Sequence, residues 1–284
     1  MKSYIDLHLH STFSDGQFNL TQLVEKAEKN NVKIISVTDH DDIRSAKEMK
    51  KIKDLNLTNI NGVELSSIVN IDEKKQRIHI LGYGYDENNK HLINTLDNKK
   101  HMRNEINEKY LLDMLKKFKY LNTDILEKIE TDKYIQLHKL IIKYLKENKY
   151  TLDQSEEIKK YLNANKVNYP NYEFTEEAAI KIILEAGGIP ILAHPYQYNL
   201  NVEQEDRLLK HLKKIGLIGV EIYHSGETKH GMKVQKDLCT KNELEWSVGS
   251  DYHTDYDDFG NEIGLGKNKN LCITDCPLIK VLKK

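Results

Sequence analysis

The sequence predicts an α/β fold built on a largely parallel sheet, and three observations lead to it. In the first third of the chain and again after residue 174, apolar strand-like segments alternate with segments whose apolar residues recur at helical spacing. Polar side chains follow the apolar segments, at the edge where parallel α/β proteins place their sites. The length of 284 residues is usual for one α/β barrel.

The first element, residues 4–10, is predicted to be a strand with two different faces. Its polar and apolar side chains alternate with a period of two, so Asp6, His8 and His10 share one face. The two histidines lie toward the carboxyl end of the strand, and Asp6 lies deeper. We therefore expect the histidines, and not Asp6, to be available for chemistry at the strand end.

Four further elements follow before residue 90. Residues 19–32 have apolar residues at helical spacing behind an Asn-x-x-Gln capping box. Residues 33–41 are an apolar strand with a polar end, and a helix is expected around residues 43–54. Residues 60–67 and 77–85 are the next two predicted strands.

The middle of the chain has a different composition. Residues 90–165 contain neither Gly nor Pro and are rich in Lys, Leu, Glu, Asn and Tyr at helical spacing. We expect three or four helices there, within an insertion that spans residues 90–174 and acts as a lid or packing subdomain. Residues 1–89 and 175–284 would then form the main α/β domain.

The alternation returns after the insertion. Residues 175–188 are predicted to be a helix, because Thr is placed to cap it, two Glu follow in its first turn and two Gly end it. Residues 189–195 read as a buried strand. The remaining predicted elements are a helix at 203–215, a strand at 217–225, a helix at 227–243 and a strand at 245–253.

Charge and cysteine content restrict the function classes. The 43 basic and 44 acidic residues give a formal net charge of −1, so no global attraction to nucleic acid or to an anionic membrane is expected. Cys239, Cys272 and Cys276 form no C-x-x-C pair and are predicted to be free thiols in a reducing compartment. No signal peptide or long apolar segment is recognised. We therefore expect a cytoplasmic protein without membrane contact, and we predict no stable protein partner.

Residues of metal-ligand type collect at the ends of the predicted strands. An H-x-H pair on a strand places two rings on one face, ~6.6 Å apart along the chain. Each of these residues, considered in isolation, could instead have a purely structural role. His79, for example, lies between two Ile residues and would by itself be interpreted as a core histidine. Buried ionisable groups need compensation, and a metal ion supplies it. The nine candidate ligands are His8, His10, Asp15, His40, Glu64, His79, His194, Asp251 and His253.

The chain resembles the polymerase-and-histidinol-phosphatase (PHP) family of metal-dependent phosphoesterases. The motifs that carry the resemblance are DLHLHSTFSDG, VTDHD, GVELS, HILGYG, AHP and GSDYH, spread in the family order over residues 6–253. The resemblance implies a distorted (β/α)7 barrel as the catalytic domain. It also implies three divalent metal ions at the carboxyl-terminal rim, for which Mn, Fe and Zn all suit the nitrogen and oxygen donors.

The family pattern also implies how the ligands are shared. It places one ion on His8, His10, Glu64 and Asp251, a second on Asp15, His40 and His194, and a third on Glu64, His79 and His253. Asp39 is expected to orient a ligand ring rather than to bind metal. A metal-activated hydroxide would attack phosphorus, so no catalytic side-chain nucleophile is expected.

The helical insertion and the GVEIYHS segment resemble the stand-alone bacterial members, which act on nucleoside 3′,5′-bisphosphates or on short 5′-phosphorylated oligonucleotides. The substrate is thus expected to be a small phosphorylated molecule, either a nucleotide or a short oligonucleotide. Arg103 and His224 are the candidate phosphate contacts, whereas Ile106 and Asn107 depart from the family's second basic position. The alternatives are a histidinol-phosphate or other small-metabolite phosphatase, and a non-catalytic module that metal ions stabilise.

Overall fold

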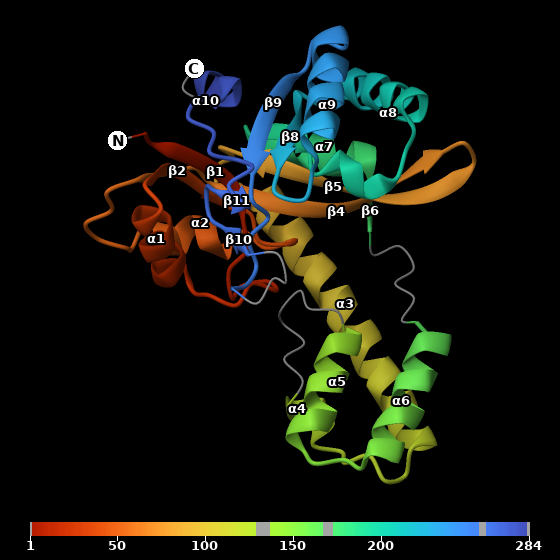
Figure 1. The fold of residues 1–284 in the computed structure, drawn as a ribbon. Helices are drawn as coiled ribbons and strands as arrows, with labels where there is room; N and C mark the ends of the chain where they lie inside the picture. Colours follow the sequence, from red (N-terminus) through yellow and green to blue (C-terminus); the bar gives the residue numbers. More distant parts are fainter. Residues whose placement is uncertain (1, 129–136, 167–172, 256–259, 283–284) are drawn as a thin grey trace. The chain divides into compact units, whose positions relative to one another are not determined.

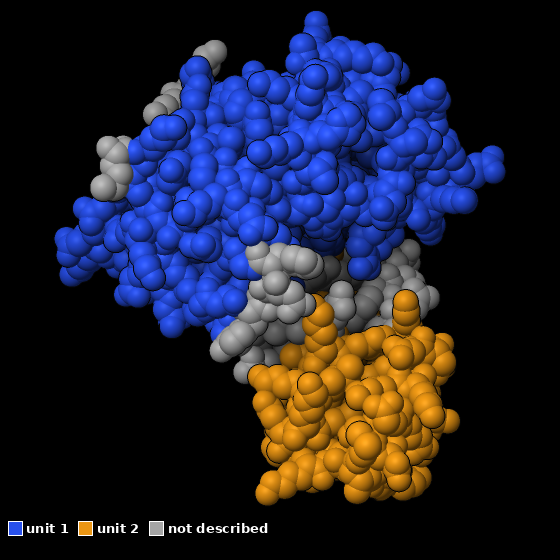
Figure 2. Space-filling view, in the orientation of Figure 1, with its two compact units in different colours: residues 1–94, 173–284 blue, residues 95–172 orange. Residues whose placement is uncertain are grey.

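The computed structural model describes most of the chain as two compact units. The described residues are 2–128, 137–166, 173–255 and 260–282. One unit comprises residues 1–94 with 173–284, and the other comprises residues 95–172 (Figure 2). Residues 129–136 and 167–172 of the predicted insertion lie outside the described residues.

The first unit is a mixed α/β structure with two main sheets (Figure 1). The smaller sheet is parallel and has the order β1 (Tyr4–Leu9), β2 (Val32–Val37), β3 (Thr58–Asn59). The larger has the order β6 (Phe174–Thr175), β4 (Gly62–Ile71), β5 (Lys74–Tyr83), β7 (Ile189–Leu192), β8 (Gly219–His224), β9 (Glu245–Gly249). A short hairpin joins β10 (Asn261–Glu262) and β11 (Gly266–Lys267).

One strand breaks the parallel arrangement. β5 is antiparallel to both of its neighbours, β4 and β7. Asp72 and Glu73 join β4 to β5 and both have positive φ, 48° and 64°. Two successive positive φ angles are typical of the tight turns that close hairpins. The sheet is therefore mixed, where the sequence predicted a largely parallel one.

Helices pack on these sheets, and two of them begin with the caps that the sequence predicted. The helices of this unit are α1 (Leu20–Lys29), α2 (Arg44–Met49), α7 (Glu176–Glu185), the 3-10 helix η1 (Pro195–Tyr198), α8 (Val202–Lys214), α9 (Lys229–Lys241) and α10 (Pro277–Leu282). The capping box of α1 is present, because Asn19 Oδ1 accepts from Gln22 N at 3.0 Å. Thr175 Oγ1 caps α7 in the same way, accepting from Ala178 N.

Two isolated bridges join the two sheets. A single parallel bridge joins Leu9, at the end of β1, to Tyr252, just after β9. A second joins His40, just after β2, to Glu64 on β4. Within the described residues these bridges connect open sheets, and the hydrogen-bonded strands form no closed barrel. The predicted α/β class is confirmed in this mixed form.

Several predicted strands end earlier than the sequence suggests. β7 ends at Leu192 and β9 at Gly249, whereas the predicted strands continue to residues 195 and 253. His194 and Asp251 have φ angles of 25° and 54°, which a strand cannot contain. The candidate ligands thus lie on backbone that turns away from the sheet.

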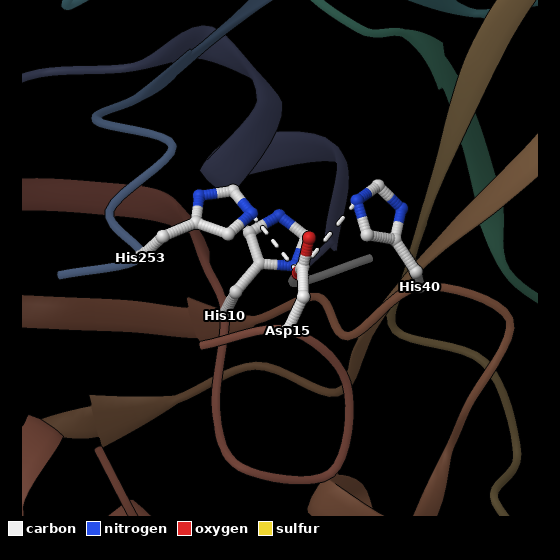
Figure 3. Close-up of side chains that lie close together, drawn as sticks. All are labelled: His10, Asp15, His40 and His253. Carbon is white, nitrogen blue, oxygen red and sulfur yellow. Dashed lines mark ion pairs between the residues drawn. The ribbon is translucent and has the colours of Figure 1, made fainter. Parts of the chain in front are cut away.

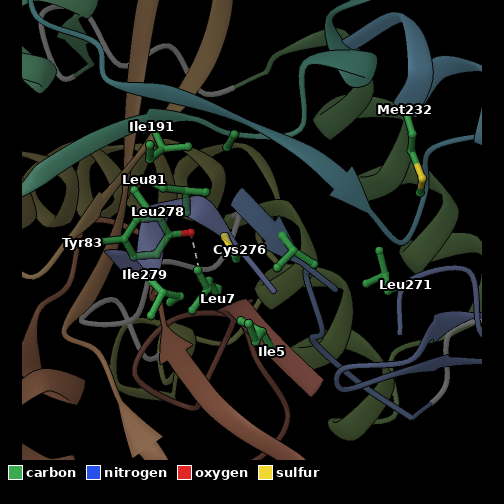
Figure 4. Close-up of a cluster of buried hydrophobic side chains, with 12 residues drawn as sticks. Ile5, Leu7, Leu81, Tyr83, Ile191, Met232, Leu271, Cys276, Leu278 and Ile279 are labelled. Atoms are coloured by element: carbon green, nitrogen blue, oxygen red, sulfur yellow. Dashed lines mark hydrogen bonds between the residues drawn. The ribbon is translucent and has the colours of Figure 1, made fainter. Parts of the chain in front are cut away.

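Two buried apolar clusters support the strands of this unit. One contains Ile5 and Leu7 of β1 with Leu81 and Tyr83 of β5, and Tyr83 Oη donates to the Leu7 carbonyl at 2.9 Å (Figure 4). The other packs Leu9 with side chains of α1 and β2. The apolar residues of β1 are therefore divided between two clusters, and both hold the strand that carries His8.

The second unit is helical. It contains most of α3 (Lys90–Lys117), with α4 (Ile125–Lys128), α5 (Leu137–Glu147) and α6 (Leu152–Ala164). Its core includes Met114, Phe118, Ile141 and Ile158. No helix among the described residues combines the length and the apolar composition that crossing a membrane requires.

We predict that Glu205 makes the first unit more stable in acid than in base. This carboxyl lies in α8, is 6% exposed, and has its pKa raised to about 7 by burial, with a further contribution from Glu227. The folded state therefore binds more protons than the unfolded state between about pH 4.5 and pH 7. The free energy of unfolding falls as pH rises through that window, and Glu205→Gln should raise the melting temperature at pH 8 more than at pH 5.

Glu203→Gln is the matched control. Both residues lie in the first turn of α8, so the control corrects for the lost charge at a helix amino terminus. Glu203 is exposed. A Glu205→Gln protein whose melting temperature follows pH as the wild type's does would contradict the prediction.

Candidate metal centre

The structure brings all nine predicted ligands into one cluster in the first unit. β1, β4 and β5 supply His8, Glu64 and His79, and the segments that follow β1, β2, β7 and β9 supply the other six. Each of the six histidines has a ring nitrogen within 4.0 Å of a carboxylate oxygen in the cluster, and each of the three carboxylates lies as close to a histidine. Segments from both ends of the chain therefore build one site.

The buried carboxylate of Glu64 lies at the centre of the cluster. Its Oε1 atom lies 2.8 Å from His79 Nδ1 and 2.9 Å from His194 Nε2. Its Oε2 atom lies 3.0 to 3.3 Å from the ring nitrogens of His40, His10 and His8. Five imidazoles thus surround one carboxylate that is 0% exposed.

Two aspartates extend the cluster on either side. Asp251 Oδ1 lies 3.2 Å from His10 Nε2 and 3.4 Å from His8 Nε2. Asp15 Oδ1 lies 3.1 Å from His253 Nε2, 3.7 Å from His10 Nδ1 and 3.9 Å from His40 Nε2 (Figure 3). In Figure 3 the three rings are grouped around this one aspartate.

The cluster shifts the pKa values of its members in opposite directions. Burial alone would raise the pKa of the Glu64 carboxyl, but the rings of His40, His79 and His8 hold that pKa well below its ordinary value. Burial also lowers the pKa of His40 to about 3 and that of His194 below its usual range. In contrast, the pKa values of His8 and His10 are raised. Burial alone would lower the pKa of His8, but Glu221, Glu64 and Asp251 hold it well above its ordinary value. In spite of burial, Asp251 and Glu64 raise the pKa of His10 to about 10. Protons on these two rings balance the buried carboxylates, and a divalent cation would take their place, because it binds ionised carboxylates and neutral imidazoles.

The donor geometry fits metal ions. His8 Nε2 and His10 Nε2 face one another at 3.1 Å, beside the oxygens of Glu64 and Asp251. The two ring nitrogens face each other so closely that they cannot both carry a proton there. A cation between them would satisfy both. The groups whose ligand atoms converge are His8 with Glu64 and His194; His8 with His10 and Asp251; His40 with Glu64 and His79; and His10, Asp15, His40 with His253.

Two histidines group differently from the sets that the sequence analysis gave. His194 was expected beside Asp15 and His40, but its ring lies against Glu64. His253 was expected beside Glu64 and His79, but its ring lies against Asp15. The strand order explains both: β7 pairs with β5, which carries His79, and the segment after β9 lies against the end of β1, which leads to Asp15.

Asp39 acts on a loop rather than directly on a ligand ring. It accepts hydrogen bonds from Ser11 N at 2.8 Å, Ser11 Oγ at 2.7 Å and Ser14 Oγ at 2.6 Å. Ser14 Oγ in turn lies 3.4 Å from His10 Nδ1. A Cβ atom on Gly16 would lie 2.1 Å from the carbonyl oxygen of His10, so this tight loop needs glycine where Asp15 leaves it.

Asp6 has a structural role. Its Oδ1 atom accepts from Ser250 N at 2.9 Å and from His8 N at 3.3 Å, and its Oδ2 accepts from Gly264 N at 2.7 Å. These bonds hold β1 to the segment that carries Asp251. Asp6 is 0% exposed, as His8 and His10 are, so its backbone partners and not its burial distinguish it from them.

β8 contributes two polar side chains, Glu221 and the predicted phosphate contact His224. Glu221 Oε1 lies 3.0 Å from His8 Nδ1, and its Oε2 accepts from His194 N at 2.9 Å. His224 Nε2 lies 3.4 Å from Asp251 Oδ2. Both side chains are buried. In the sequence, the signal for them was a carboxylate and an imidazole within an otherwise apolar strand. Arg103, the other predicted phosphate contact, is a buried side chain of α3 in the second unit.

Comparison with known proteins gives the same assignment as the motifs. The chain is 30% identical over 281 residues to a 5′-3′ exoribonuclease of Haemophilus influenzae, covering 98% of both proteins. It is 24% identical over 267 residues to a 3′,5′-nucleoside bisphosphate phosphatase of Chromobacterium violaceum, covering 88% of this chain and 87% of that protein.

A solved structure shares the fold. A protein of Chromobacterium violaceum, described as an amidohydrolase with bound sulfate and no metal, superposes with a TM-score of 0.75 at 23% identity, over 99% of this chain and 96% of its own. The family model of the PHP domain matches residues 6–165, more than half of the 284 residues. The chain therefore belongs to the PHP domain family.

Proposed function

We propose that this protein is a metal-dependent phosphoesterase that hydrolyses phosphomonoesters. The observation that carries the proposal is the convergence of six histidines and three carboxylates on one buried centre. The activities of the two relatives, a 5′-3′ exoribonuclease and a 3′,5′-nucleoside bisphosphate phosphatase, support a nucleoside 3′,5′-bisphosphate or a short 5′-phosphorylated oligonucleotide as the substrate. We also propose that the protein is cytoplasmic and has no stable protein partner.

We propose three divalent ions, Mn, Fe or Zn, in sets revised by the geometry. The sets are His8, His10, Glu64 and Asp251; Glu64, His79 and His194; and Asp15, His40 and His253. Glu64 joins the first two sets, because different oxygens of its carboxylate face them. Divalent ions held here would lower the pKa of a bound water and neutralise phosphoryl oxygens.

The protein's own residues give the centre a closed side and an open side. His8, His10 and Glu64 have 0% exposed side chains, so they exclude water from the inner wall. The side chains of Asp251, His79, Asp15 and His253 are 18% to 28% exposed. A phosphate group would therefore approach from the side of these four ligands, with His224 of the same unit as a proposed contact. Arg103, in the second unit, is proposed separately as a phosphate-binding residue.

The strand arrangement supports a distorted seven-stranded barrel. The seven strands, in order, would be β1, β2, β4, β5, β7, β8 and β9. The bridges between His40 and Glu64 and between Leu9 and Tyr252 are the two links that would close it. We propose that residues 90–174 are an insertion into this barrel.

Release of phosphate from a substrate panel tests the proposed activity. Purified protein supplied with Mn²⁺ should release phosphate from adenosine 3′,5′-bisphosphate, or phosphate or mononucleotides from 5′-phosphorylated oligonucleotides, faster than it releases phosphate from histidinol phosphate. A preference for histidinol phosphate would favour the small-metabolite phosphatase. Metal binding without release from any ester would favour the non-catalytic module.

We predict that His8→Ala loses bound metal and activity together. His8 Nε2 faces Glu64 and Asp251, so its removal takes a nitrogen donor from the most buried set. The turnover number should fall by more than the roughly 10- to 100-fold cost of losing an outer partner of a ligand. Elemental analysis and phosphate release measure the two effects.

His211→Ala is the matched control for this experiment. His211 lies on α8, is half exposed and pairs with Glu176 away from the cluster. Its metal content and turnover should equal those of the wild type. If the His8→Ala protein kept full metal content, the assignment of β1 to the metal centre would be wrong.

We predict that Arg103→Ala raises KM and leaves the metal content unchanged. A charge-assisted bond to phosphate contributes about 1.5 to 3 kcal/mol, so KM should rise roughly 10- to 100-fold. Arg207→Ala, which removes an exposed arginine that pairs with Asp72, is the control. A fall in kcat with KM unchanged would contradict a role for Arg103 in holding the substrate.

A further inference from the structure

We propose that Glu221 is a positioning residue that prepares His8 and His194 for the metal centre. This inference rests on the proposed function, because it concerns how the protein presents two of the proposed ligands. Glu221 lies on β8 and is 1% exposed. Each of its oxygens has a partner from the protein: Oε1 lies 3.0 Å from His8 Nδ1, and Oε2 accepts from His194 N at 2.9 Å.

The contact with His8 selects one tautomer of the ring. An ionised carboxylate only accepts hydrogen bonds, so the proton of a neutral His8 must lie on Nδ1. The lone pair of that ring then lies on Nε2. This nitrogen lies 3.1 Å from His10 Nε2 and 3.3 Å from Glu64 Oε2, inside the cluster. Glu221 therefore points the donor atom of His8 at the proposed ion.

The contact with His194 stabilises an uncommon backbone conformation. His194 has φ 25°, in the left-handed region that a residue with a side chain seldom adopts. The bond from its N–H to Glu221 helps to hold this conformation, in which His194 Nε2 lies 2.9 Å from Glu64 Oε1. One carboxylate thus fixes ligands of two different proposed ions.

The neighbouring strand leaves room for this arrangement. Gly249 ends β9, between β8 and the end of β1. A Cβ atom there would lie 2.4 Å from Glu221 Oε1 and 2.1 Å from His8 Cβ. Those distances are too short for any side chain, so glycine at 249 lets the carboxylate reach His8 past β9.

The test compares metal binding by Glu221→Gln and by the wild type. Glutamine keeps the shape, but its single oxygen cannot accept from both His8 Nδ1–H and His194 N–H, and its NH₂ group opposes one of them. We expect Zn²⁺ affinity to fall about 10- to 100-fold for at least one ion, as on loss of other outer partners of metal ligands. Titration calorimetry with Zn²⁺ and elemental analysis measure this change.

Glu205→Gln is the matched control. It makes the same substitution at another buried glutamate, on α8 and outside the cluster, and should bind Zn²⁺ as the wild type does. Circular dichroism of the metal-free proteins establishes that each is folded. A wild type that binds no metal would overturn the proposed function. Wild-type and Glu221→Gln proteins with equal affinity and stoichiometry would overturn only the role of Glu221.

A second measurement applies even if Glu221→Gln does not fold. In the Zn²⁺-loaded wild type labelled with ¹⁵N-histidine, His8 should show a protonated, hydrogen-bonded Nδ1 and a metal-bound Nε2. His8→Gln assigns the signal by its loss. An unprotonated Nδ1 on His8 would overturn the proposal, because Glu221 could not then accept its proton.

Discussion

The buried carboxylate of Glu64 is the interaction on which the rest of the site depends. An ionised carboxylate removed from water costs several kcal/mol unless opposite charge or hydrogen bonds compensate it. Here the compensation comes from five ring nitrogens within 3.3 Å, contributed by His8, His10, His40, His79 and His194. Those rings come from four different strands or their ends, so the carboxylate can be buried only if the sheets meet as they do. The fold and the site therefore share one requirement.

The strand ends meet because the backbone leaves the sheet there. His194 and Asp251 have positive φ, and this turns their segments across the end of the sheet instead of along it. Asp41, which follows β2, also has positive φ, 49°. These segments still bond to neighbouring strands, because Asp251 N donates to His8 O at 2.9 Å and Asp41 N donates to Glu64 O at 2.9 Å. Irregular backbone at these points costs strain, but it places side chains from distant parts of the chain around one centre.

Local patterns and long-range order were predictable to different degrees. Alternation and helical spacing depend on near neighbours, so the main strands and helices were predicted within a few residues. The nine candidate ligands were identified because each lies at or near the end of a predicted strand and within a motif of the family. His194 and His253 contact other members of the cluster than the predicted sets imply. Those contacts depend on which strands are neighbours, and no local pattern encodes that β7 pairs with β5. The short hairpin of β10 and β11 and the helix α10 were not predicted, because each has six or fewer residues and little periodicity.

The hydrogen-bond partners of the buried carboxylates distinguish those with a structural role from the candidate metal ligand. Asp6, Asp39, Glu64 and Glu221 are all 0% to 1% exposed, so burial does not distinguish them. Asp6 and Asp39 accept from backbone N–H and serine groups, whose donors satisfy them fully within the protein. Glu64 faces ring nitrogens that would themselves need protons to be its donors, and a divalent ion resolves that conflict better than several buried imidazolium ions could. Glu221 combines both kinds of partner, a backbone N–H and a ring nitrogen, and this is why it can hold a ligand in place without being one.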